Sequence, residues 1–193
     1  MLHFIVRNVY KPACSAQYAR LIYVSIVGMT LIACHTARPS GIKVVNDFDI
    51  QRFQGTWYEI ARLNHAFEKG LTDVSAIYEQ QSDGPINVIN QGYDPLQKKW
   101  YTAHGTALFL DRPTIGALKI SFFWPFYGGY YVVALDKQHY QWAMIAGPTH
   151  RYLWILSRER TLAAAITTQL VNQARLLNFP TEQLIFVQHH REK

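Results

Sequence analysis

From about residue 55 onward, short runs of alternating apolar and polar residues are separated by turn residues. In one run, Val74, Ala76 and Tyr78 fall on one face of an extended chain, with polar residues between them. A period of two residues predicts strands that bury one face. The predicted strands are 56–62, 72–79, 86–91, 98–109, 117–123, 129–135, 140–146 and 151–157. Because the gaps are short, neighbouring strands are expected to pair antiparallel.

A helical period follows the last predicted strand. Apolar residues recur there at spacings of four, four, four and three, which predicts a helix over 161–178 with one apolar face. The residues on that face are Leu162, Ile166, Leu170, Ala174 and Leu177. Thr161 is expected to cap the start of the helix. The apolar stripe is expected to pack on the outer wall of the sheet.

Eight strands in up-and-down order predict an all-β fold, an antiparallel up-and-down β-barrel with one C-terminal α-helix packed outside. Such a barrel closes without a free edge and can hold one small ligand. The folded domain is expected to span 46–188, with a short last strand at 183–187 and a polar tail at 189–193.

The first 33 residues have the pattern of a secretory signal. Three basic residues, Arg7, Lys11 and Arg20, lie within the first 20 positions. A short apolar run spans 21–33, too short for an ordinary membrane span. The alternative is an uncleaved anchor. The sequence Leu31-Ile32-Ala33-Cys34 resembles the lipobox of bacterial lipoproteins, which implies cleavage, acylation of Cys34 and a flexible tether over 34–45. By the same resemblance, a residue other than Asp at position 35 favours the outer membrane. A chance cysteine is the alternative.

Charge and cysteine content exclude several classes of function. The net charge of +6 is mild and no basic run occurs within the predicted barrel, so no nucleic acid partner is expected. Both cysteines precede the barrel, which therefore has no thiol nucleophile. The histidines of the barrel are dispersed along the sequence, and we predict no metal site and no cofactor.

Strand order predicts which residues meet at one end of the barrel. Trp57 begins the first strand and Arg158 ends the eighth, and closure places these two strands side by side. A guanidinium over an indole face stabilises by about 0.5–2 kcal/mol. We therefore predict that Trp57 and Arg158 plug this end, called the bottom. The alternative is an ordinary core tryptophan and a solvated arginine.

Three stretches carry a family resemblance. Gly55-Thr56-Trp57-Tyr58, Ala134-Leu135-Asp136 and the run from Tyr152 to Arg158 resemble the three conserved regions of the lipocalins. Leu135 replaces the usual threonine of the second region, which leaves the hydrogen bonding of the bottom turn open. Stretches at 44–49, 88–93 and 121–130 resemble the bacterial outer-membrane lipocalins, and the resemblance covers residues 34–188.

The inner faces of the strands predict an apolar and aromatic pocket that binds a lipid. Asn90 is a candidate for the polar head of the ligand, and Tyr127 lies in the 124–128 connection at the expected mouth. The predicted wall residues are Val74, Ala76, Tyr78, Leu118, Ile120, Phe122, Tyr130, Val132, Tyr152 and Trp154. A dry, filled core is the alternative. Glu59 has the same parity as Trp57, and a buried carboxylate there would need a partner that the sequence does not identify.

These features predict a lipid carrier rather than an enzyme. We expect a fatty acid or lysophospholipid as ligand, and the resemblance implies a lipid-anchored protein of the outer membrane, facing the periplasm, with a role in envelope maintenance. One alternative is a lipid-modifying enzyme that uses Glu59, His104 or His139. Another is a structural envelope lipoprotein. A homodimer, if formed, would have to use barrel faces or loop tips.

Overall fold

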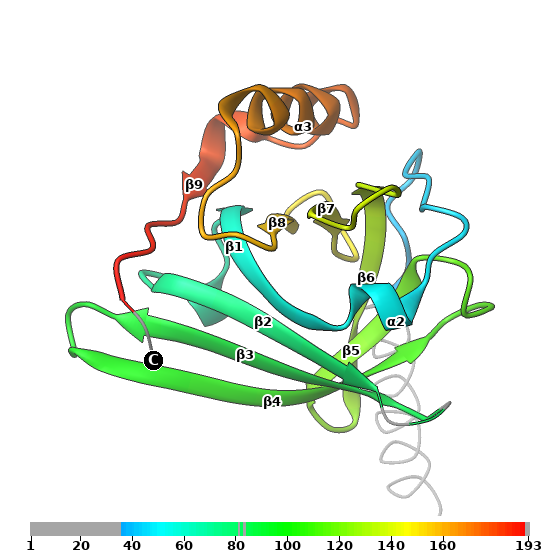
Figure 1. The fold of residues 1–193 in the computed structure, drawn as a ribbon, viewed down its shortest axis with the longest axis horizontal. Helices are drawn as coiled ribbons and strands as arrows, with labels where there is room; N and C mark the ends of the chain where they lie inside the picture. Colours follow the sequence, from blue (N-terminus) through cyan, green and yellow to red (C-terminus); the bar gives the residue numbers. More distant parts are fainter. Residues whose placement is uncertain (1–35, 81, 83, 192–193) are drawn as a thin grey trace, which may run out of the picture. The chain divides into compact units, whose positions relative to one another are not determined.

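The computed structural model describes residues 36–80, 82 and 84–191. In this part of the chain, eight strands form a closed antiparallel barrel and a ninth extends its sheet (Figure 1). The eight are β1 (Gly55–Leu63), β2 (Thr72–Gln80), β3 (Ile86–Asp94), β4 (Lys99–Phe109), β5 (Ala117–Phe123), β6 (Phe126–Leu135), β7 (Trp142–Ala146) and β8 (Leu153–Ser157). Each pairs with the next, and β1 pairs with both β2 and β8. The predicted fold class is confirmed.

Two of the predicted strand limits were wrong for local reasons. Tyr140 has a positive φ of 56° and belongs to the turn, so β7 begins at Trp142 and not at 140. β6 begins at Phe126, so the β5–β6 connection is only Trp124-Pro125 and not 124–128. Side-chain alternation does not reveal where a hairpin turns, because a tight turn keeps apolar residues on both sides of it.

The register between strands determines which side chains face inward. Trp57 lies opposite Ala76, Ala76 opposite Asn90, and Asn90 opposite Ala103, so the four form one inner row across β1 to β4. A register shift between Glu59 and Ala61 interrupts the alternation of β1. As a result, Glu59 and Arg62 both face inward, opposite Leu156 and Trp154.

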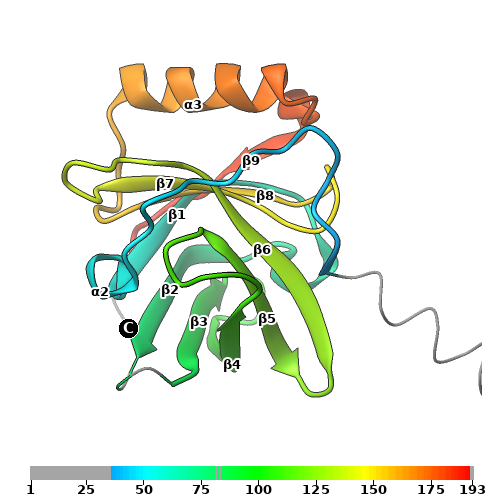
Figure 2. The same cartoon turned by 90° about the vertical axis from the view of Figure 1, so that its right-hand side faces the viewer.

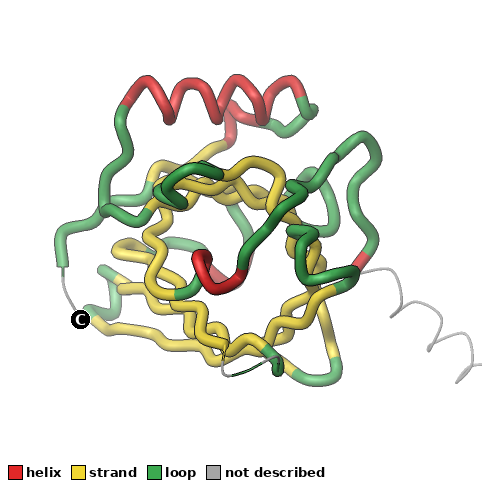
Figure 3. The backbone as a smooth tube through the Cα atoms, turned by 45° about the vertical axis from the view of Figure 1, so that its right-hand side comes forward, coloured by secondary structure: helices red, strands yellow, loops and turns green. Residues whose placement is uncertain are grey.

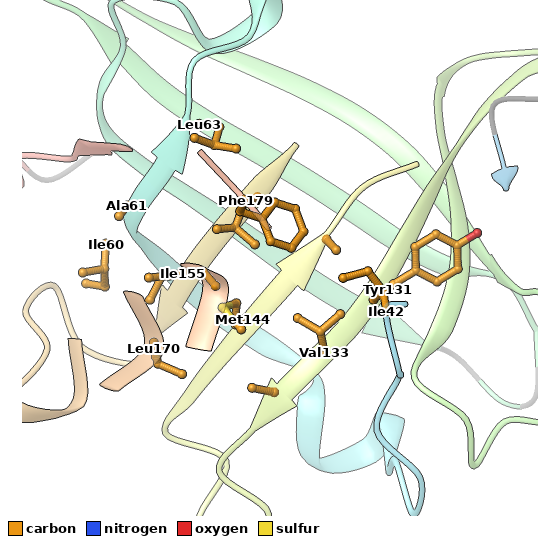
Figure 4. Packing of buried hydrophobic residues seen from close by; sticks show 14 of the residues in the cluster. Ile42, Ile60, Ala61, Leu63, Tyr131, Val133, Met144, Ile155, Leu170 and Phe179 are labelled. Carbon is orange, nitrogen blue, oxygen red and sulfur yellow. The ribbon is translucent and has the colours of Figure 1, made fainter. Parts of the chain in front are cut away.

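Helix α3 (Ala164–Leu176) packs on the outside of the barrel (Figure 2). Leu170 and Ala174 are buried against β7 and β8, where Met144 and Ile155 form part of the same core (Figure 4). The predicted apolar face is thus confirmed. The helix is shorter than 161–178, and its N-cap is Ala163 without a side-chain bond, so the predicted cap by Thr161 was wrong.

The chain after α3 returns to the barrel. The short strand β9 (Leu184–Phe186) pairs with the upper half of β1. Beyond it, the Asp73 amide of β2 donates to the Gln188 carbonyl, and the Asp73 carboxylate accepts from the amides of His190 and Arg191. The residues predicted as a polar tail therefore bridge β1 and β2 above the point where these strands stop pairing.

Burial would raise the pKa of Asp73, but hydrogen bonds from Thr72, His190 and Arg191 outweigh it and hold the pKa below its usual value. The carboxylate is therefore ionised near neutral pH and keeps its bonds to the tail.

Residue 34, the predicted acylation site Cys34, lies outside the described residues, as do residues 1–33 and part of the predicted tether. None of the helices within the described ranges has the length and apolar character that a membrane span requires.

Candidate functional site

The bottom of the barrel is closed by a short helix and an indole. Helix α2 (Ile50–Phe53) lies across the ring of strands, as the tube view shows (Figure 3). Its Phe53 ring stacks on Trp57 with centroids 4.6 Å apart, and the Trp57 indole N–H donates to the Phe53 carbonyl over 2.8 Å. Trp57 is fully buried, so this end excludes water.

Arg158 completes the closure. Its guanidinium carbon lies 4.0 Å from the centroid of the Trp57 ring, which confirms the predicted contact. Its nitrogens donate to the carbonyls of Thr56 at 2.9 Å, Arg52 at 2.7 Å and Tyr140 at 3.2 Å. Burial lowers the pKa of Arg158, but a guanidinium stays a cation at any physiological pH. Arg158 therefore joins three separate segments at the bottom.

The bottom turn is organised by Asp136. Its hydrogen bonding was left open by the sequence because Leu135 replaces the threonine that is usual in this region. The Asp136 carboxylate accepts from the amides of Gln138, His139 and Gln141. Arg52 of α2 donates to the Lys137 and Gln138 carbonyls, 3.2 and 2.7 Å away. The sequence did not predict this role of α2; the available signal was Asp49, whose carboxylate caps the helix at Gln51 and Arg52.

Above the plug, the lumen is apolar and lined by predicted residues. Tyr78, Leu118 and Val132 are buried in the same core as Trp57, and this core also includes the partly buried Ala76, Ile120, Tyr130 and Trp154. The hydroxyls of Tyr78 and Tyr130 lie 2.8 Å apart, so each has a partner across the lumen. Burial raises the pKa of both phenols, which therefore stay neutral.

The upper lumen is open on the side of β4 and β5. These strands pair only from Thr106 to Phe109, and above this point inward-facing side chains meet solvent. Phe122 lies over Gly105, where an added Cβ would come within 2.7 Å of the ring, and Phe122 remains 40% exposed. A hollow of about 500 Å³ beside these strands touches Phe122 and Gly105, but most of its lining faces outward, including His104 and Tyr127, so its volume is not that of the lumen.

Two further wall residues lie on the inner face of β2 and β3. Val74 is buried and packs over Gly92 of β3: a Cβ added to Gly92 would lie 3.3 Å from the Val74 side chain. Asn90 lies in the inner row, and its side-chain oxygen, Oδ1, is buried with no hydrogen-bond partner in the described part of the chain. A buried acceptor without a partner is suited to a donor from a ligand head or a water molecule.

Of the two remaining predicted tyrosines, Tyr127 lies on the outer face of the barrel and Tyr152 lies near its mouth. The Tyr127 ring lies 4.8 Å from the Lys119 ammonium, and Lys119 alternates with the inward Leu118 and Ile120. Tyr127 therefore lies on the outer face, and we do not retain it as a pocket residue. Tyr152 stacks with Trp154 at 6.2 Å and stays near the mouth.

A buried polar cluster lies on the inner wall beneath the β1–β2 loop. The Arg62 Nη1 atom lies 2.6 Å from the Glu59 Oε1 atom, and both side chains are almost fully buried. The Glu68 carboxylate accepts from the Trp154 indole at 3.1 Å, and its Oε2 atom lies 3.1 Å from the His65 Nε2 atom. Arg62 is thus the partner of Glu59 that the sequence did not identify, because the β1 register shift puts residues three apart on one face.

The two carboxyl groups of the cluster shift in opposite directions. Burial and then the charge of Glu68 raise the pKa of Glu59 well above its usual value, against the opposing effect of Arg62. Burial would also raise the pKa of Glu68, but its contact with His65, the Trp154 bond and Arg62 lower it overall. The pair therefore favours one proton, held on the Glu59 side.

The residues of the alternative enzymatic hypothesis do not converge. Glu59 is buried on the inner wall, whereas His104 is exposed on β4 opposite Ile89, and His139 is exposed in the bottom turn. The three side chains therefore lie at separate places and form no common site.

Comparisons with known proteins agree with this geometry. The lipocalin-like domain model matches residues 48–189. The chain belongs to the lipocalin family. It is 44% identical to the outer membrane lipoprotein Blc of Escherichia coli K12 over 169 residues, covering 87% of this chain and 95% of the relative. The Blc protein of Citrobacter freundii is 48% identical over 158 residues, or 81% and 89% of the two chains.

A solved structure shows the same fold at lower identity. Insecticyanin from the tobacco hornworm Manduca sexta superposes with a TM-score of 0.63 and 18% identity, over 81% of this lipocalin and 88% of that chain. This likeness supports the barrel fold alone.

Proposed function

We propose that this lipocalin is a carrier that binds one single-chain amphiphile, a fatty acid or a lysophospholipid, in its calyx. The observation that supports it most is the asymmetry of the barrel. One end is sealed by Trp57 and Arg158, while inward-facing Tyr101 and Phe122 at the other end are 38% and 40% exposed. An acyl chain can enter such a lumen from above and cannot pass through it.

The apolar wall provides the free energy for binding. Transfer of a methylene group from water stabilises by about 0.8 kcal/mol, so roughly ten methylenes give micromolar affinity after the costs of association. Asn90 and the Tyr78–Tyr130 pair provide polar groups along the wall. These groups fit a polar head or ester and leave the acyl chain in apolar surroundings.

The named relatives support a lipid-anchored location. Because the Blc proteins are called outer membrane lipoproteins, we propose that Cys34 is acylated and holds this chain on the outer membrane, with the barrel in the periplasm. The rim is suited to work near a bilayer, since Phe123 and Trp124 of the β5–β6 hairpin are 76% and 79% exposed. A role in transport or storage of envelope lipids follows from this placement.

The test compares two neighbouring residues of β4 that face opposite ways. Ala103 faces the lumen opposite Asn90, and His104 faces outward opposite Ile89; both are exposed. A fluorescent fatty acid is titrated into the full chain in lipid nanodiscs, because a detergent would itself compete for the calyx. The wild type should bind saturably, Ala103→Trp should weaken binding at least about tenfold, and His104→Trp should leave it unchanged.

Two results would count against the proposal. Either the wild type shows no saturable binding, or the two substitutions weaken binding equally. Mass spectrometry of protein extracted from its own membrane tests the anchor, since Cys34 should carry acyl groups and a single-chain lipid should co-purify. Conversion of the bound lipid on prolonged incubation would favour an enzyme instead.

A further inference from the structure

The loop between β1 and β2, residues 64–71, is attached to the barrel wall through Glu68, through the rings beside His65 and through Arg62. This mouth loop stands at the open end, and its Glu68 accepts from Trp154 of β8 and contacts His65. Arg62 of β1 donates to the Glu68 carbonyl at 2.8 Å and to the Leu71 carbonyl at 3.1 Å. The exposed Phe67 stacks on His65, with ring centroids 4.0 Å apart. The position of the loop therefore depends on Glu68 and on the groups that surround it.

The surrounding charges balance only when the cluster holds one proton. Arg62 is the permanent cation that links the two acidic residues: its Nη1 atom lies 2.6 Å from the Glu59 Oε1 atom, and its Nη2 atom donates to the Glu68 carbonyl at 2.8 Å. The charge of Glu68 raises the pKa of Glu59, so the two carboxyl groups act on each other. With a proton on Glu59, or on His65, the cluster is neutral. Without it, two carboxylates face one guanidinium in a site that water does not reach, which is costly.

We propose that this cluster is a proton-operated latch, which holds the mouth loop closed while Glu59 and Glu68 share a proton and releases it when that proton is lost. Release would carry Glu68 into water and separate the two carboxylates. Through His65, the mouth loop borders Tyr152 and Trp154 at the mouth. Its release would uncover this part of the mouth, so the bound amphiphile would exchange faster. The inference rests on the proposed function for its ligand, but the movement of the loop does not.

The direction of the pH effect follows from the two opposite shifts. Since the pKa of Glu59 is raised in the closed form, the closed form is favoured at low pH and loses stability as pH rises from about 4.5 through the raised value. The lowered pKa of Glu68 acts at the acid end, where stability is lost as pH falls below about 4.5. The loop should therefore be held most firmly in mildly acidic solution and loosen towards alkaline pH.

Other groups that face Glu59 come from each neighbouring element. Arg62 lies on β1, His65 and Glu68 on the mouth loop, and Tyr78 on β2, where its phenol is neutral. Trp154 of β8 donates to the Glu68 carboxylate, and the Nε2 atom of His189 in the C-terminal segment lies 2.8 Å from the main-chain carbonyl of Glu59. Of these, His65 is the group whose contribution to the pH effect the experiment has to distinguish from that of Glu59.

The experiment measures hydrogen exchange of residues 64–71 in the full chain in zwitterionic nanodiscs from pH 5 to pH 9, corrected for intrinsic rates. The amides of Glu68 and Leu71 are hydrogen-bonded within the loop and report its closure. In the wild type, the protection of these two amides should be at least about tenfold lower at pH 9 than at pH 5. Glu59→Gln keeps a donor for Glu68 and an acceptor for Arg62 without titrating, so its protection should be constant. Glu79→Gln, an exposed position of β2, should behave as the wild type.

Constant protection in the wild type would overturn the latch. A Glu59→Gln variant that keeps the full pH dependence would also overturn it, because the response would then not come from Glu59. If Glu59→Gln does not fold, Glu68→Gln removes the same repulsion and should also be constant. A fluorescent fatty alcohol, whose head does not titrate, should dissociate faster at pH 9 than at pH 5 from the wild type alone. Absence of alcohol binding at any pH would refute the proposed carrier function while the exchange result still decides the latch.

Discussion

Each end of this barrel holds an arginine, half-buried at the bottom and fully buried near the mouth, and the two are bound by different means. At the bottom, the Arg158 guanidinium lies over Trp57 and donates to three main-chain carbonyls. Near the mouth, Arg62 donates to the Glu59 carboxylate and to two carbonyls of the mouth loop. Carbonyl acceptors and an indole do not titrate, whereas Glu59 does.

Because of this contrast, only the mouth can respond to a change of pH. The bottom is held by groups whose charge is the same at every physiological pH, and it joins α2, β1 and the bottom turn into one closed base. The mouth is held by a cluster whose net charge depends on one proton. A carrier needs this combination, because a ligand must be retained at one end and exchanged at the other.

The most damaging change should be Trp57→Ala. It removes a fully buried indole that packs on Phe53 and Arg158, and we expect a loss of about 3–5 kcal/mol in the free energy of unfolding. Urea unfolding measures the loss. The matched control is Trp100→Ala, which removes a half-buried ring on the outer face beside Tyr93. Equal losses for the two variants would show that the base is not a special element of the fold.

Arg62→Met should have the next largest effect, and this effect should depend on pH. The substitution leaves Glu59 buried without its cation, which costs about 3 kcal/mol where Glu59 is ionised. At pH 5 the loss should be smaller, because the raised pKa of Glu59 lets the carboxyl group take a proton. Urea unfolding at pH 5 and pH 8 gives the comparison, and a loss that is the same at both would contradict the titrating mouth.

Arg158→Lys should have the smallest effect of the three, about 1–2 kcal/mol, and it should be independent of pH. A lysine keeps the charge but cannot reach three carbonyls at once or stack flat on the indole. The same unfolding measurement at pH 5 and pH 8 should return one value. Arg112→Lys, in an exposed loop, is the control and should be neutral. A loss that changes with pH would remove the contrast between the two ends.

Several features of the site could be predicted because they depend on strand order alone. The meeting of Trp57 and Arg158 follows from closing eight strands in sequence order, and the inward direction of Ala76, Leu118 and Trp154 follows from alternation. The Arg62 partner of Glu59 could not be predicted, because it depends on a register shift that leaves no mark in the local pattern. Tyr127 was misplaced because β6 begins at Phe126, three residues earlier than the predicted strand, so Tyr127 belongs to the strand and not to a loop at the mouth.

The barrel, the order of its strands and the face of α3 that packs against it follow from the sequence, because they depend on the period of apolar residues along one strand or helix. Which polar groups share a buried site depends instead on contacts between distant parts of the fold. Glu59, Arg62, Glu68 and Trp154 come from two strands and a loop, and their proton balance exists only where closure of the barrel brings them within hydrogen-bonding distance and removes water from between them.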